Sequence, residues 1–178
     1  MAVQNASSDI LSTLDATPPI SRNVSPYLYK GVSREVIGSL ALTATQAGGD
    51  AGSVWRIVRV PSRARISQIW LLSDALDAGT GGALKVNLGF YNTSAKGGAA
   101  VDANVLLSEN ALLRAAVGLM AEIYGSFGSA VQEQRVWEVC GLSSDPSADL
   151  DLAFTVSTAA AAAAAGGVLL KVVFVDDF

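Results

Sequence analysis

Regular alternation of apolar and polar residues constrains the fold of this chain more than any other feature of its sequence. In the segment LKVNLGFY, residues 84–91, every second side chain is large and apolar, and those between are polar, glycine or amphipathic. A period of two is that of a β-strand with one face on a core and the other toward water. Residues 149–156 and 32–43 repeat the pattern, so the sequence predicts a β-rich domain.

Segments between the predicted strands indicate how they connect. Residues 66–72 and 84–90 flank the loop SDALDAGTGGA, whose glycines and aspartates suit turns, so we expect these strands to pair as an antiparallel hairpin. The alanines at 159–165 have a high helix propensity, but so short a helix is marginal in water. We therefore expect a second hairpin connection there, with at most one helical turn, before a terminal strand over 168–175.

The terminal strand and the middle of the chain are less regular. Residues 168–175 are apolar on both faces apart from Lys171, which predicts a strand either buried on both sides or covered by another subunit. Between residues 101 and 124 the apolar residues fall near a helical period and favour a helix over short strands. A shorter helical turn is predicted around Trp137, ended by Gly141 in the left-handed conformation.

The strands and turns together predict an all-β fold, an antiparallel β-sandwich of jelly-roll type with an extended N-terminal arm. The predicted domains are the arm, residues 1–30, and the sandwich, residues 31–178. The arm is rich in Ser, Thr, Asn and Pro, and it is either a disordered tail or an extended arm on a neighbouring subunit. Its apolar residues are candidate contacts: Ile10, Leu11, Leu14, Tyr27 and Tyr29.

Charge and hydropathy limit the possible partners. The net charge of −4 argues against nucleic acid, because phosphate binding needs concentrated Lys and Arg. No apolar stretch approaches the roughly 20 residues that span a bilayer, and the N-terminus lacks a secretory signal, so no membrane partner is expected. A third of the 12 basic residues form one cluster: Arg56, Arg59, Arg63 and Arg65. This cluster is either solvated or a salt-bridging contact for an acidic protein.

Residue types that carry common enzyme chemistry are scarce. The chain has no histidine and a single cysteine, Cys140, which excludes Ser-His-Asp and Cys-His catalysis, zinc sites built from Cys and His, and an intrachain disulfide. Cys140 lies among apolar residues and is interpreted as a small buried side chain. We therefore predict no catalytic residue, no cofactor and no metal ligand.

Aspartates and aromatic residues have ordinary structural explanations. Asp149 and Asp151 lie on the polar side of a predicted strand, where a solvated face is expected. The loop residues Asp74, Asp77 and Asp102 lack the ligand spacing of a calcium motif. Aromatic side chains are predicted to anchor the core rather than form an exposed binding surface: Trp55, Trp70, Trp137, Phe90, Phe154 and Phe174.

A series of short motifs runs in order through residues 32–175. The motifs are Val60-Pro61 with Ala64 and Ile66, Gly89 with Tyr91 and Thr93, Val101-Asp102-Ala103, Trp137, Gly141-Leu142 and Asp145-Pro146. In this order the chain resembles the capsid decoration, or cement, proteins of tailed bacteriophages. Two departures, Phe90 where that family favours Leu and the pure alanine run, affect packing more than function.

The resemblance implies a non-enzymatic virion structural protein, made in the host cytoplasm, that binds the outer surface of an icosahedral phage head. It would stabilise the head by bridging major capsid protein subunits, and would itself form a dimer or trimer. The candidate contacts are the arm and the arginine-bearing strand, which is predicted over residues 54–60 and ended by Pro61. An alternative of a different class is a carbohydrate- or receptor-binding β-sandwich module of a phage tail, which requires exposed aromatic side chains gathered on one face.

Overall fold

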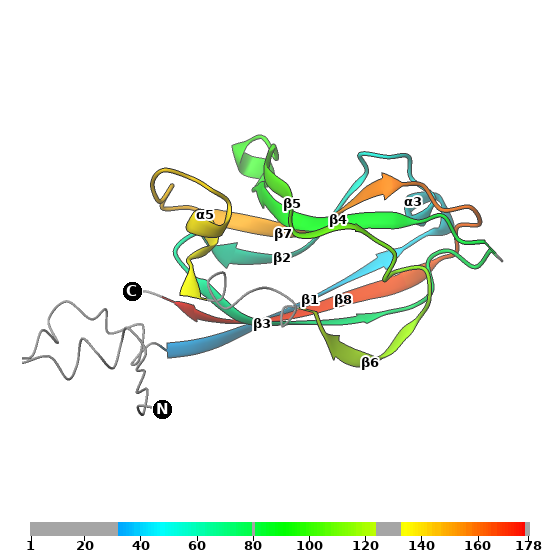
Figure 1. Cartoon of the computed structure of the whole chain (residues 1–178), viewed down its shortest axis with the longest axis horizontal. Coiled ribbons are helices and arrows are strands. Elements are labelled where there is room, and N and C mark those ends of the chain that lie inside the picture. The colour runs from blue at the N-terminus through cyan, green and yellow to red at the C-terminus, as the bar shows by residue number, and fades with distance from the viewer. Residues whose placement is uncertain (1–31, 80, 124–132, 177–178) are drawn as a thin grey trace, which may run out of the picture.

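The computed structural model describes residues 32–79, 81–123 and 133–176, which form two four-stranded antiparallel sheets packed face to face (Figure 1). One sheet has the strand order β1-β8-β3-β6, with β1 (Val32–Leu42), β8 (Gly166–Asp176), β3 (Arg65–Ser73) and β6 (Val117–Glu122). The other has the order β2-β7-β4-β5, with β2 (Val54–Pro61), β7 (Asp149–Thr158), β4 (Lys85–Asn92) and β5 (Ala100–Asn110). This arrangement is a jelly roll, which confirms the predicted fold class.

Helical structure in the described residues is short. The elements are α3 (Ala44–Ala47), the 3-10 helix η1 (Ser94–Lys96) and α5 (Val136–Val139). The last confirms the turn predicted around Trp137, and Gly141 follows it with a φ of 67°. No helix in the described ranges is long and apolar enough to cross a membrane. The predicted arm, residues 1–30, and its boundary with the sandwich lie outside those ranges.

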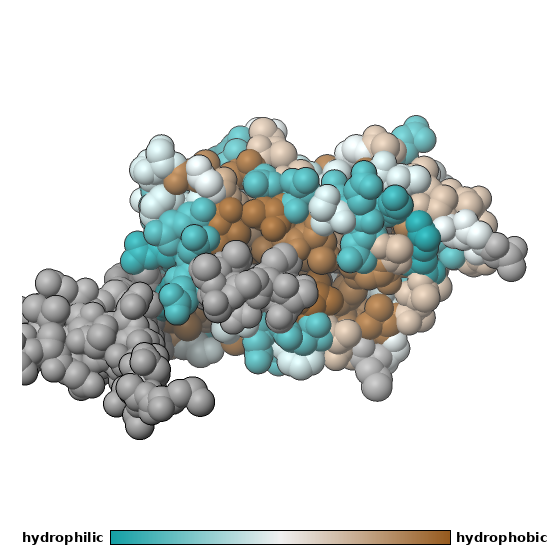
Figure 2. Space-filling model, viewed as in Figure 1, coloured by the Kyte–Doolittle hydropathy of each residue, from teal (hydrophilic) through white to brown (hydrophobic). Residues whose placement is uncertain are grey.

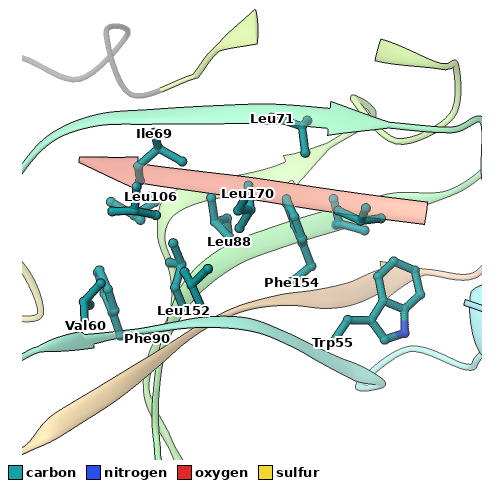
Figure 3. Close-up of a cluster of buried hydrophobic side chains, with 14 of the residues drawn as sticks. Trp55, Val60, Ile69, Leu71, Leu88, Phe90, Leu106, Leu152, Phe154 and Leu170 are labelled. Atoms are coloured by element: carbon teal, nitrogen blue, oxygen red, sulfur yellow. The ribbon is translucent and has the colours of Figure 1, made fainter. Parts of the chain in front are cut away.

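The core fills the space between the two sheets (Figure 3). The apolar positions of the most regular strand, Leu84, Val86, Leu88 and Phe90, have no exposed surface. Their neighbours across the interface come from the other sheet, among them Ile69 of β3. The alternation that predicted the strands therefore also identified the buried faces.

Two glycines allow close approaches between neighbouring strands. A Cβ at Gly89 in β4 would lie 2.1 Å from the carbonyl oxygen of Asp102 in β5. A Cβ at Gly38 in β1 would lie 2.1 Å from the carbonyl oxygen of Ile57 in β2. Real Cβ atoms do not tolerate such distances, so any other residue would push these strands apart.

Both predicted hairpins are wrong. The strands on either side of the loop at residues 74–84, β3 and β4, belong to different sheets, and so do β7 and β8 on either side of the alanine run. Leu76 and Leu84 in the first connection are fully buried, so this connection crosses the end of the sandwich and closes its core. The roughly 10 Å between packed sheets is easily spanned by a connection of this length.

The helix favoured for residues 101–124 is also wrong where the chain is described. Residues 100–110 form β5 and residues 117–122 form β6, on either side of a tight turn in which Arg114 N–H donates to the Ala111 carbonyl. The physical reason is pairing, because β5 extends one sheet beside β4 and β6 covers the open edge of β3. Backbone groups at a sheet edge need such partners.

The terminal strand β8 is not buried on both sides within one chain. Val168, Leu170 and Val172 face the core and are fully buried, whereas Leu169 and Lys171 on the other face are only half-buried. The aromatic prediction is confirmed in part: Trp55 and the three named phenylalanines are buried, but Trp70 and Trp137 are half-buried. Cys140 is buried, as expected.

Candidate functional site

The outer face of sheet β2-β7-β4-β5 carries polar side chains, and we call it the polar face. At its centre lies Asp151, which is only 5% exposed. Its carboxylate forms ion pairs with Arg56 Nη1 at 3.4 Å and with Arg59 Nε at 2.7 Å. The prediction of a solvated face for Asp151 is therefore wrong, because two guanidinium groups cover it. The neighbouring Asp149 is exposed.

A β-bulge brings the two arginines together. Residues three apart in a regular strand face opposite sides of the sheet, but the register of β2 against β7 shifts between Arg56 and Val58. With Ile57 as the extra residue, both Arg56 and Arg59 point outward onto Asp151. The bulged Ile57 carbonyl is the group that approaches Gly38, so the glycine in β1 and the arginine pair in β2 belong to one structural feature.

Arg56 is committed to contacts inside the chain. Its guanidinium also donates to the carbonyl oxygens of Asn92 at 3.0 Å and Gly98 at 2.6 Å, and it lies 5.1 Å from the centre of the Tyr91 ring. These contacts attach the loop after β4 to the polar face. Arg59 is 54% exposed, and its hydrogen bond to Asp151, with the negative charge there, raises the pKa of Arg59 above its ordinary value.

A second buried carboxylate holds another arginine of the predicted cluster. Asp176, at the end of β8 and 5% exposed, accepts contacts from Arg63 Nε at 3.3 Å and Arg34 Nε at 3.7 Å. Arg65 lies at the start of β3 and pairs with Val175 of β8, so it belongs to the sheet β1-β8-β3-β6 and not to the sheet of Arg56 and Arg59. The four predicted arginines thus do not form one patch. Arg34 was missed, although its inward register in the first predicted strand was a signal that it needs an acidic partner.

The outer face of sheet β1-β8-β3-β6 is different in character, and we call it the apolar face. Strand register directs these apolar side chains outward: Ile37, Trp70, Leu72, Met120, Leu169, Val173 and Val175. Ile37 is 54% exposed and Met120 is 38% exposed, at opposite edges of the sheet. One ion pair stands among them, Lys171 Nζ to Glu35 Oε2 at 2.6 Å.

A hollow of about 390 Å³ opens at one end of the apolar face, beside β3, β6 and β8. The ribbon of β6 diverges from that of β3 in Figure 1. Leu72, Val117 and Leu169 supply the apolar walls of the hollow, while Gly118 and Gly167 leave it open. Hydrophobic residues also gather between the two sheets on the side of the sandwich seen in Figure 2. Exposed apolar side chains gathered on one face are typical of sites that bind other proteins.

Two of the loop aspartates that lack the spacing of a calcium motif, Asp77 and Asp74, hold backbone groups of the chain. Asp77 is 4% exposed, and its two oxygens accept four backbone N–H groups, from Ala83, Leu84, Ala161 and Ala162. Asp74 accepts the Gly167 N–H at 2.7 Å. Within the described ranges, no group of three or more His, Cys, Asp or Glu side chains is placed to hold a metal ion.

Two further groups have little capacity for chemistry. Burial, with a smaller effect of the Asp102 charge, raises the pKa of Cys140 to about 12, so its thiol is a poor nucleophile. None of the three tryptophans is fully exposed, whereas a carbohydrate-binding face needs aromatic rings open to solvent. The arm residues Ile10, Leu11, Leu14, Tyr27 and Tyr29 lie outside the described residues.

Comparison with known proteins gives a likeness in structure alone. No protein-family model and no curated protein sequence matches the chain. A chain in the capsid asymmetric unit of cyanophage Pam1 superposes with a TM-score of 0.56 and 18% identity, over 84% of this chain and 88% of that one. A chain in the capsid of Ralstonia phage GP4 superposes with a TM-score of 0.60 and 15% identity, over 83% and 86%. At these identities the fold is what the chains share.

Proposed function

We propose that this chain is a non-enzymatic structural protein of a phage virion that binds the outer surface of an icosahedral head. The observation that carries the proposal is the jelly roll, shared over more than four fifths of the chain with chains from two phage capsids. The series of short sequence motifs, which in its order along the chain resembles that of capsid decoration proteins, supports the same role. In this role the protein bridges subunits of the major capsid protein, associates with itself, and is made in the host cytoplasm.

The distribution of side chains fits binding better than catalysis. The polar face uses Arg56 and Asp151 for internal contacts, and Asp77 braces two loops. The apolar face, in contrast, leaves Ile37 and Met120 exposed on a rigid sheet. Repetition of the contacts that each bound copy makes with the head, over the many equivalent positions of a capsid, makes modest affinities add up through avidity.

The N-terminal arm is the proposed bridge to a neighbouring subunit. It joins β1 at Val32, and β1 is an edge strand of its sheet. A fully extended chain of 30 residues reaches roughly 100 Å, against roughly 36 Å for an 11-residue strand. The apolar contacts of this arm are Ile10, Leu11, Leu14, Tyr27 and Tyr29. The charged contacts of the sandwich are Arg59, Arg63 and Arg65, while Arg56 holds Asp151 and the loop after β4 in place.

Co-sedimentation with undecorated heads tests the proposal. The full chain is expected to sediment with heads of its own phage at a fixed, saturable ratio to the major capsid protein. Removal of residues 1–30 is expected to weaken binding strongly, and Arg59→Ala is expected to weaken it more than Lys96→Ala, which removes an exposed cation from the loop after β4. A full chain that binds no form of the head would overturn the proposal.

A further inference from the structure

We propose that the apolar face, the outer surface of sheet β1-β8-β3-β6, is covered by the same face of a second copy of this chain. The inference rests on the self-association included in the proposed function, but not on binding to a capsid. It also gives the half-buried side of β8 the partner that its apolar sequence predicted. The argument depends on the composition, area, charge and shape of this face.

Composition separates this face from the rest of the described surface. Three outward residues of the central strand β8 are the aliphatic Leu169, Val173 and Val175. In the neighbouring strand β3, Leu72 pairs with Leu169 and Trp70 pairs with Lys171. A solvated sheet face normally presents polar side chains at these positions. On the polar face, by comparison, Arg56, Asp151 and Tyr91 bind one another or nearby loops, and so need no second chain.

The area of the face matches that of a stable dimer. The strands β1, β8, β3 and β6 have 11, 11, 9 and 6 residues, and at the usual rise and strand spacing they cover roughly 600 Å² on one copy. Specific interfaces bury about 600–1,000 Å² on each partner. Two such faces packed together therefore form an interface of ordinary size, and sheets pack on one another at about 10 Å without special adjustment.

Charge favours a second copy over an unrelated surface. The charged side chains Glu35 and Lys171 stand side by side in neighbouring strands near the middle of the face. In a two-fold arrangement each residue of one copy meets the same surface on the other. Two Glu35–Lys171 pairs can then approach head to tail, so each of these four charges gains a second opposite charge.

The face also carries both projecting side chains and a hollow, as a surface that packs against a copy of itself requires. Ile37 and Met120 project from the two edge strands, and the hollow between Leu72, Val117 and Leu169 lies on the same face. Because a two-fold interface uses one surface twice, each copy supplies both the projecting side chains and the hollow. Burial of these apolar groups provides the free energy of association.

Sedimentation velocity of the full chain and three variants tests the inference. The wild-type protein is expected to sediment at twice its mass of 18.2 kDa. Ile37→Glu and Met120→Glu each place a charge in the interface and are expected to weaken association by a hundredfold or more. Val54→Glu is the matched control, because Val54 is an exposed apolar residue on the opposite sheet, and it is expected to leave the dimer intact.

Circular dichroism and thermal unfolding of the same variants distinguish a variant that no longer associates from one that no longer folds. Ile37 and Met120 are exposed in the single chain, so the variants are expected to retain the circular dichroism spectrum of a β-sandwich. A wild-type protein that is monomeric at all concentrations, a particle of three copies, or a dimer that both variants leave intact would overturn the inference. Co-sedimentation of the monomeric variants with heads reports separately on capsid binding.

Discussion

Replacement of Asp77 by alanine is expected to destabilise the sandwich more than any other single change to a loop carboxylate. The Asp77 carboxylate accepts hydrogen bonds from the N–H groups of Ala83 and Leu84, just before β4, at 2.7 and 2.9 Å. It also accepts hydrogen bonds from the N–H groups of Ala161 and Ala162, in the alanine run, at 3.2 and 2.9 Å. A single side chain thus ties together the two long connections at one end of the sandwich.

The magnitude follows from the four donors. A buried donor left without a partner costs about 1–3 kcal/mol, but three of these N–H groups are only partly buried and can reach water. We therefore expect Asp77→Ala to lower the free energy of unfolding by about 3–6 kcal/mol, a large part of the 5–15 kcal/mol typical of a domain. Asp77→Asn keeps acceptors for some of the donors, so its cost should be smaller, about 1–3 kcal/mol.

The effect should also depend on pH. Burial by itself would raise the pKa of Asp77, but the four N–H donors favour the ionised form and lower its pKa well below the ordinary value. A carboxyl group with a lowered pKa in the folded state stabilises the fold fully above its unfolded pKa of about 3.9, and loses this contribution as the pH falls toward the folded value. The difference between wild type and Asp77→Asn should therefore shrink below about pH 4.

Urea unfolding at several pH values measures both effects. Asp74→Ala is the matched control, because Asp74 is an exposed aspartate in the same loop with one backbone N–H partner, Gly167, and it should cost under about 1.5 kcal/mol. If Asp77→Ala and Asp74→Ala unfold at the same urea concentration at neutral pH, the bracing role of Asp77 is refuted.

Three further changes probe other parts of the fold. Gly38→Ala should lower the free energy of unfolding by about 1–3 kcal/mol, because the new Cβ would meet the Ile57 carbonyl. Gly81→Ala, which has open space around it, should lower it far less. Equal unfolding temperatures of the two variants would contradict this. Asp151→Ala should cost about 1–3 kcal/mol by removing the acceptor of two arginines, and an unchanged urea midpoint would refute it. Cys140 should resist alkylation in the folded protein and react in urea, as mass spectrometry can show; full labelling of the folded protein would argue against its burial.

The strands could be predicted from the sequence because their signal is local. At residues 84–91 each side chain reports its own burial, so alternation identifies both the strand and the face that meets the core. The same holds for β1 and β7. The pairing of strands is not a local property. The sequence of the loop at 74–84 does not determine whether β4 returns to the sheet of β3 or crosses to the other sheet. The predicted hairpins failed for this reason.

The ion pairs could be predicted only in part. The sequence identifies the arginines, but Arg56 and Arg59 are three residues apart and would face opposite sides of a regular strand. The bulge at Ile57 that joins them on Asp151 depends on Gly38 in another strand. The helix prediction for residues 101–123 was wrong for a similar reason. Their apolar residues have helical spacing, but pairing of β5 with β4 and of β6 with β3 outweighs that local preference.

Cryo-electron microscopy of heads mixed with the purified full chain tests the central proposal most directly. We predict additional density on the outer surface of the head that fits the eight-stranded sandwich, repeats with the icosahedral symmetry, and contacts more than one subunit of the major capsid protein. Heads that show no added density at saturating protein, or density confined to the tail, would contradict a head-binding role for this chain.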